Sequence, residues 1–159
     1  MRKEIYLQLI RLLNSKDEIK HISLWNENIE NLETEPTFQM PAVFIEFGEM
    51  EWKQGGNRAK NATTEITLHI ITETLADISA DAEYREEALS RFDIIDKAVA
   101  SVECKGGKGF NKLQHKRSMT DHNHGRVCHD MEVFVCEVTD KRQVPEAMTM
   151  QDLKPEITA

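Results

Sequence analysis

Histidines gather in one short stretch of the sequence, together with aspartate and cysteine. Four of the six histidines fall between residues 115 and 129. Imidazole, thiolate and carboxylate groups are the ligands that zinc prefers, and a His-x-His turn can direct two ring nitrogens at one ion. If this stretch binds a metal, the candidate ligands are His115, His122, His124 and His129.

The spacing of these histidines matches no strong zinc signature, and it has a purely structural explanation. Cys128 and His129 would point to opposite faces of a strand, so only a subset of the cluster could converge on one ion. Polar side chains at a hairpin tip commonly bond the backbone of their own turn. We therefore expect a polar hairpin tip that binds no metal and no cofactor, with metal binding as the alternative.

Signatures of other enzyme chemistry are weak. Cys128 and Cys136 lie in a β-rich stretch, where a free cysteine usually behaves as a small buried hydrophobe. The glycines within 105–109 follow a predicted helix rather than leading from a strand into one, so they do not form a phosphate-binding loop. Glu46 and the acids that follow it at a strand end are expected to form a solvated rim. The sequence therefore predicts no catalytic residues and no enzyme.

The spacing of apolar residues predicts the elements that position these side chains. The expected elements are a helix from the N-terminus to about Asn14, strands over 21–25, 41–47 and 63–72, a helix over 77–104, and strands over 110–119 and 127–138. The second helix has the clearest period, and Gly106-Gly107 can cap its end. The order α-β-β-β-α-β-β predicts an α+β fold, with a mainly antiparallel sheet and the long second helix packed on one face.

The domain organisation follows from the length of 159 residues, which suits one domain. Residues 1–138 are expected to form this domain. After Val138 the apolar residues lose their period, so 139–159 are expected to be an extended or disordered arm.

Charge excludes several classes of partner. The chain has 20 basic and 28 acidic residues and a net charge of −8. This balance argues against nucleic acid, because nucleic-acid binding depends on a net-basic surface, and against a membrane surface. The apolar runs are far shorter than the roughly 20 residues that span a bilayer, and the N-terminus does not resemble a signal peptide. We expect a protein that is cytosolic where it is made.

Opposite charges are separated along the chain. Residues 26–51 contain seven acids and no bases, whereas residues 105–126 contain six bases and one acid. Two opposed patches can form a head-to-tail subunit interface that closes a ring, or they can face each other within one subunit or simply be solvated. For the interface, the predicted residues are Glu27, Glu30, Glu33, Glu35, Lys105, Lys108, Lys112, Lys116, Arg117 and Arg126.

The order of elements over residues 1–138 resembles a known family. The matching segments are Leu24-Trp25-Asn26-Glu27, Pro41–Phe47, Thr67–Ile70 and Ile94–Ala98. They are similar to tail-terminator or tail-completion proteins of siphophage-type bacteriophages and prophages, including the minor tail protein U type.

This resemblance implies a structural role in the virion tail, after assembly in the host cytoplasm. Such proteins form a ring, commonly of six subunits, that ends the tail tube and faces the head. The implied partners are further copies of the chain, the tail-tube protein and the head–tail connector proteins. By position, the loop 48–61 and the basic hairpin 105–126 would make the contacts. The alternatives are a connector or adaptor of the same virion, and a metal-binding module or metal-dependent enzyme that uses the histidine-rich hairpin.

Overall fold

The computed structural model describes residues 1–26, 38–74, 79, 81 and 83–141. Its elements are α1 (Arg2–Leu13), β1 (His21–Leu24), β2 (Ala42–Phe47), β3 (Lys53–Gln54), the short 3₁₀ turn η1 (Gly56–Arg58), β4 (Lys60–Glu73), α2 (Arg85–Val102), β5 (Gln114–Asp121) and β6 (Val127–Asp140). The expected α+β fold and element order are confirmed, with β3 as an additional short strand. None of the helices in the described ranges is long and apolar enough to cross a membrane.

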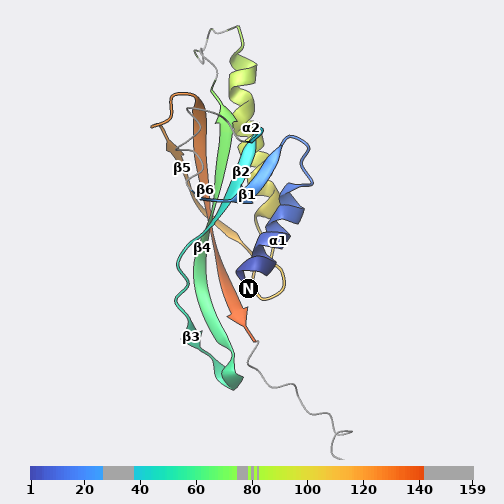
Figure 1. Cartoon of the computed structure of the whole chain (residues 1–159), viewed down its shortest axis with the longest axis vertical. Coiled ribbons are helices and arrows are strands. Elements are labelled where there is room, and N and C mark those ends of the chain that lie inside the picture. Colours follow the sequence, from blue (N-terminus) through green and yellow to red (C-terminus); the bar gives the residue numbers. More distant parts are fainter. Residues whose placement is uncertain (27–37, 75–78, 80, 82, 142–159) are drawn as a thin grey trace, which may run out of the picture.

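The strands form one mixed sheet in the order β1-β2-β4-β6-β5, and β3 pairs with the start of β4 (Figure 1). Only β1 and β2 run parallel among the described strand pairs. The long strands β4 and β6 pair along their full length, from Lys60 opposite Asp140 to Glu73 opposite Val127. The β3–β4 hairpin extends beyond the helices in Figure 1.

The two faces of this sheet differ in composition, because successive strand residues point to opposite sides. On β4, Ile66, Leu68 and Ile70 pack in the main core with both helices. His69 and Ile71 alternate with them and therefore lie on the other face, where Ile71 belongs to a smaller apolar cluster with Phe44 and Trp25. We call this second side the open face, since α1 and α2 lie together on the opposite side.

The helix α1 follows the predicted apolar stripe, with Ile5, Leu9 and Leu13 fully buried. The helix α2 departs from its prediction, because it begins at Arg85 rather than at residue 77. Of the residues before it, 75–78, 80 and 82 lie outside the described ranges. The second half of α2 packs into the core, whereas Phe92 in its first half is exposed. Figure 1 shows the first turns of α2 at one end of the molecule. There Leu89 and Phe92 line a groove beside the end of β4 rather than packing into the core.

The predicted glycine cap of this helix is wrong. Cys104, which follows the C-cap residue Glu103, takes the left-handed conformation instead, with φ 59°. Gly106 and Gly107 lie in the turn that follows, where added side chains would collide with neighbours. A Cβ at Gly107 would lie 2.5 Å from the Phe110 ring. These glycines therefore permit close packing of the turn rather than ending the helix.

Candidate functional site

A chain of hydrogen-bonded polar side chains crosses the open face of the sheet. His69 on β4 and His129 on β6 are both buried, and His69 Nδ1 lies 2.8 Å from His129 Nε2. The other ring nitrogen of His69, Nε2, lies 2.8 Å from Oε2 of Glu46 on β2. Three strands far apart in the sequence therefore supply one continuous network. Glu46 is 47% exposed, as the sequence predicts for a residue at the solvated end of a strand, but its carboxylate also bonds to a buried histidine.

The carboxylate of Glu46 determines which nitrogen of each ring carries the proton. A carboxylate only accepts hydrogen bonds, so neutral His69 donates its Nε2–H to Glu46 and presents a bare Nδ1. This bare Nδ1 must accept, so His129 donates through its Nε2–H. The consequence is that Nδ1 of His129 carries a lone pair. In the described structure this buried atom has no hydrogen-bond partner.

Aromatic packing keeps the two imidazoles of this network away from water. The indole of Trp25 lies parallel to the His69 ring, with centroids 3.8 Å apart, and also stacks on His129 at 5.4 Å. Burial lowers the pKa of His69, although its bond to Glu46 partly opposes the shift. Burial, together with neighbouring His69, lowers the pKa of His129 to about 4. Both rings are therefore neutral at neutral pH, as a metal-binding imidazole must be.

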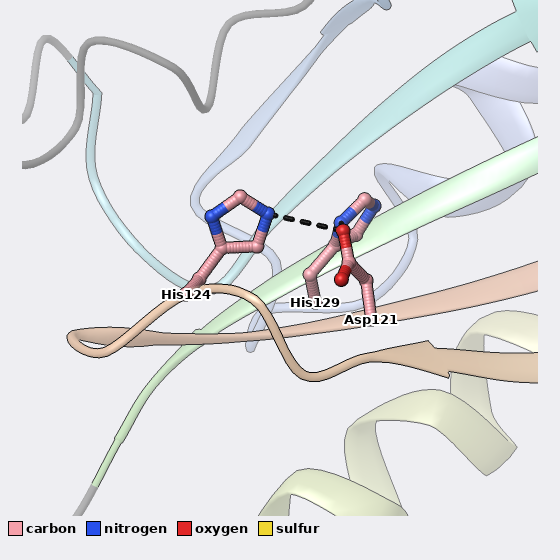
Figure 2. Close-up of side chains that lie close together, drawn as sticks. All are labelled: Asp121, His124 and His129. Carbon is pink, nitrogen blue, oxygen red and sulfur yellow. Dashed lines mark ion pairs between the residues drawn. The ribbon is translucent and has the colours of Figure 1, made fainter.

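Asp121, at the end of β5, faces the network from the hairpin tip. Its Oδ1 accepts hydrogen bonds from the backbone N–H and the side-chain amide of Asn123, which is the predicted turn contact. Its Oδ2 lies 3.2 Å from His124 Nε2 and 3.6 Å from His129 Nδ1. Figure 2 shows the two imidazoles and the carboxylate gathered at one point. The Asn123 bond and the two imidazoles lower the pKa of Asp121.

The four predicted metal ligands do not converge as a set. His124 and His129 come together with Asp121, and one ligand atom from each residue lies within 4.8 Å of the others. His115 lies on the helix-facing side, where its Nε2 is 2.6 Å from Oε2 of the buried Glu132. His122 is exposed and does not belong to the Asp121 group. A β-bulge between His115 and Arg117 separates the ligands, because it pairs His115 with Phe134 of the helix-facing side while Asp121 pairs with His129 of the open face.

The predicted charge patches are only partly described. The acidic interface candidates Glu27, Glu30, Glu33 and Glu35 lie outside the described residues. The six basic candidates are all exposed but do not form one patch. Lys105, Lys108 and Lys112 precede β5 and Arg126 follows its far end, about 26 Å away at 3.3 Å per residue. Arg117 pairs within the chain, 2.9 Å from Glu65 on β4.

An apolar groove lies between the first half of α2 and the adjacent end of the sheet. It has a volume of about 360 Å³, and its lining includes Leu89, Phe92 and Ile94 of α2 with Met40 and Pro41 before β2. Leu89 and Phe92 are 46% and 47% exposed, respectively. Large apolar side chains exposed beside a groove are typical of a surface that contacts another molecule.

Sequence reasoning missed Glu46, His69 and Trp25. Two local features of the sequence pointed to two of them. Glu46 is a charged residue at the end of the apolar run of β2, and His69 is a histidine inside the apolar run of β4. Their meeting depends on register, because Phe44 is opposite His69 and places Glu46 diagonally across from it. This register cannot be derived from either strand alone.

Comparison with known proteins finds similarity at the level of solved structures. No protein-family model matches the chain, and no curated protein matches it. Among solved structures, the fold is similar to that of a chain in the "Virion of native gene transfer agent (GTA) particle". The match has a TM-score of 0.50 and 10% sequence identity, and covers 88% of this chain and 95% of that chain. At this identity the match shows a shared fold.

Proposed function

We propose that this protein is a non-enzymatic structural component of a phage-related virion, and that it forms a ring that terminates the tail tube and joins it to the head connector. The observation that carries the proposal is the fold shared with a chain of a gene transfer agent virion over nearly the whole of both chains. The resemblance of residues 1–138 to tail-terminator proteins supports the same role. The proposed partners are further copies of this chain, the tail-tube protein and the head–tail connector proteins.

A ring needs two different contact surfaces on each subunit, because head-to-tail contacts are heterologous. The apolar groove beside Leu89 and Phe92 is one suitable surface. The β3–β4 hairpin is another, since it lies within the expected contact loop 48–61 and is preceded by the exposed Trp52. Figure 1 places α2 and this hairpin at opposite ends of the molecule. Apolar side chains at such surfaces stabilise an interface by removing their area from water.

The role is tested by deleting the coding gene from the genome that produces the particle and imaging the lysate by electron microscopy. A terminator predicts tail tubes of uncontrolled length without attached heads, because nothing stops polymerisation. Tails of normal length beside separate heads would instead assign the protein to the head–tail connector. Complete particles of normal appearance would contradict both roles.

Ring formation is tested on the purified protein by size exclusion with light scattering, with and without purified tail tubes. We expect a multimer near six subunits that the single variants Phe92→Glu and Trp52→Ser weaken. Leu7→Gln is the matched control, because Leu7 is as exposed as Phe92 but lies on α1, away from both proposed surfaces. Equal assembly of all variants would contradict the proposed contact surfaces.

A further inference from the structure

We propose that Asp121, His124 and His129 form a binding site for one divalent transition-metal ion of the zinc class. One ligand atom from each residue lies within 4.8 Å of the others. Two imidazoles and one carboxylate are a donor set that zinc accepts, with the remaining position of a four-coordinate ion open to water. Asp121 and His124 are partly exposed at the hairpin tip, so an ion can enter from solvent.

Two of the three separations between the ligand atoms suit this ion, and the two histidine nitrogens lie within 4.8 Å of each other. Zinc binds nitrogen and oxygen at about 2.0–2.1 Å, so neighbouring ligands at a tetrahedral zinc lie about 3.3 Å apart. The carboxylate Oδ2 of Asp121 is 3.2 Å from His124 Nε2 and 3.6 Å from His129 Nδ1. Small side-chain movements would therefore complete the site. His124 would bind as the tautomer that carries its proton on Nδ1.

The orphaned nitrogen of His129 is an independent reason for a cation here. His129 is only 4% exposed, and its Nδ1 has no hydrogen-bond partner in the described structure. Its lone pair points at the Asp121 carboxylate, which is also an acceptor. A buried polar atom without a partner is costly. A metal ion between the two atoms would satisfy both.

The surrounding hydrogen bonds already orient two of the ligands. A metal-binding histidine usually donates its other N–H to a neighbouring acceptor, and His129 donates through Nε2 to His69, which in turn bonds to Glu46. Asn123 occupies Oδ1 of Asp121, so Oδ2 remains available to the ion. The bound ion would tie the β5–β6 turn to the buried part of the sheet.

The first test uses untagged, chelator-treated full-length protein titrated with zinc chloride by calorimetry and by thermal unfolding. We expect one zinc ion per chain and a Tm that rises with zinc concentration, because the ion binds the folded state. His124→Ala should weaken binding by about hundredfold or more, since it removes a direct ligand whereas outer-shell changes alone cost 10–100-fold. His122→Ala is the matched control on the same turn and should bind zinc as the wild type does.

The second test separates ligand loss from misfolding. Asp121→Asn keeps an Oδ1 acceptor for Asn123 but replaces Oδ2 by an amide N–H that can donate to His129 Nδ1. We expect this variant to lose zinc binding while its metal-free Tm stays at or above that of the wild type. The proposal is overturned if the wild type binds no zinc saturably, if His122→Ala weakens binding as much as His124→Ala, or if Asp121→Asn binds zinc normally.

Discussion

The indole of Trp25 lies flat on the imidazole of His69, with the ring planes 3° apart. The backbone N–H of Trp25 bonds to the carbonyl of Ile45, which holds the residue against the sheet just beyond β1. A short edge strand thus positions the aromatic cover of the histidine network. This arrangement links the N-terminal segment of the chain to residues near its C-terminal end.

Replacing Trp25 with alanine should open the network to water. We expect a loss of about 2 kcal/mol in the free energy of unfolding, less than the 3–5 kcal/mol typical of a fully buried aromatic residue, because Trp25 is partly exposed. The pKa of His129 should rise from about 4 toward its ordinary value of 6.5, since burial is the main cause of its shift. NMR titration of the imidazole resonances measures this change. Trp25→Phe should keep most of the shift, and unchanged histidine pKa values in Trp25→Ala would contradict the shielding role.

As the pH is lowered, the metal-free protein should begin to lose stability at a higher pH than protonation of its carboxylates alone would cause. The folded pKa of His129 is about 4 and its ordinary value is 6.5, so between these pH values the unfolded state binds more protons. Stability must then fall as pH falls through this window, and stop falling for this group below about pH 4. The lowered pKa of His69 acts in the same direction.

This prediction is measured as the urea midpoint between pH 7 and 5 in the presence of chelator. Most carboxylates stay ionised over this range, so the histidines dominate the change. His122→Ala is the control and should follow the wild-type curve, because that side chain is exposed. A midpoint that does not change between pH 7 and 5 would rule out neutral buried histidines.

Replacing Cys104 with glycine should stabilise the protein. Cys104 holds a φ of 59° just after α2, a conformation that glycine adopts without the steric cost borne by other residues. We expect a gain of about 1 kcal/mol in the free energy of unfolding, measured by urea denaturation. Cys104→Ala also removes the exposed thiol but retains a Cβ, so it should give no comparable gain. Equal midpoints for the two variants would contradict backbone strain at this position.

Charge reversal should separate the basic residues by role. Lys112→Glu with Lys116→Glu should weaken self-association, and raised salt should do the same, if these exposed lysines contact an acidic segment of a neighbouring subunit. Arg117→Glu should act mainly inside the subunit, because it breaks the pair with Glu65 at a cost of about 0–1 kcal/mol.

Light scattering and urea denaturation together measure the two effects. The exchange Arg117→Glu with Glu65→Arg should restore any stability lost by Arg117→Glu alone. Self-association that is indifferent to the lysine changes and to salt would contradict the charged interface.

Much of the fold could be predicted because its signals are local. Ile5, Leu9 and Leu13 recur at helical spacing in α1, and the alternation of Ile66, Leu68 and Ile70 identifies a strand with one core face. The start of α2 could not be predicted, since acidic residues before Arg85 favour a helix start equally well at several positions. The predicted glycine cap of α2 was also wrong, because two glycines near a helix end do not reveal whether the chain needs them for backbone conformation or for close packing.

The candidate site was predictable only in part. The sequence alone determined that the β5–β6 turn is rich in possible ligands and that Asp121 can bond its own turn, because both properties depend on residues a few positions apart. The tertiary structure decided which ligands meet. The β-bulge between His115 and Arg117 places His115 on the helix-facing side, and pairing of β4 with both β2 and β6 brings Glu46, His69 and His129 next to one another. The proton positions in this network, and so the lone pair on His129, follow from contacts between residues 23 and 60 positions apart, which no local pattern encodes.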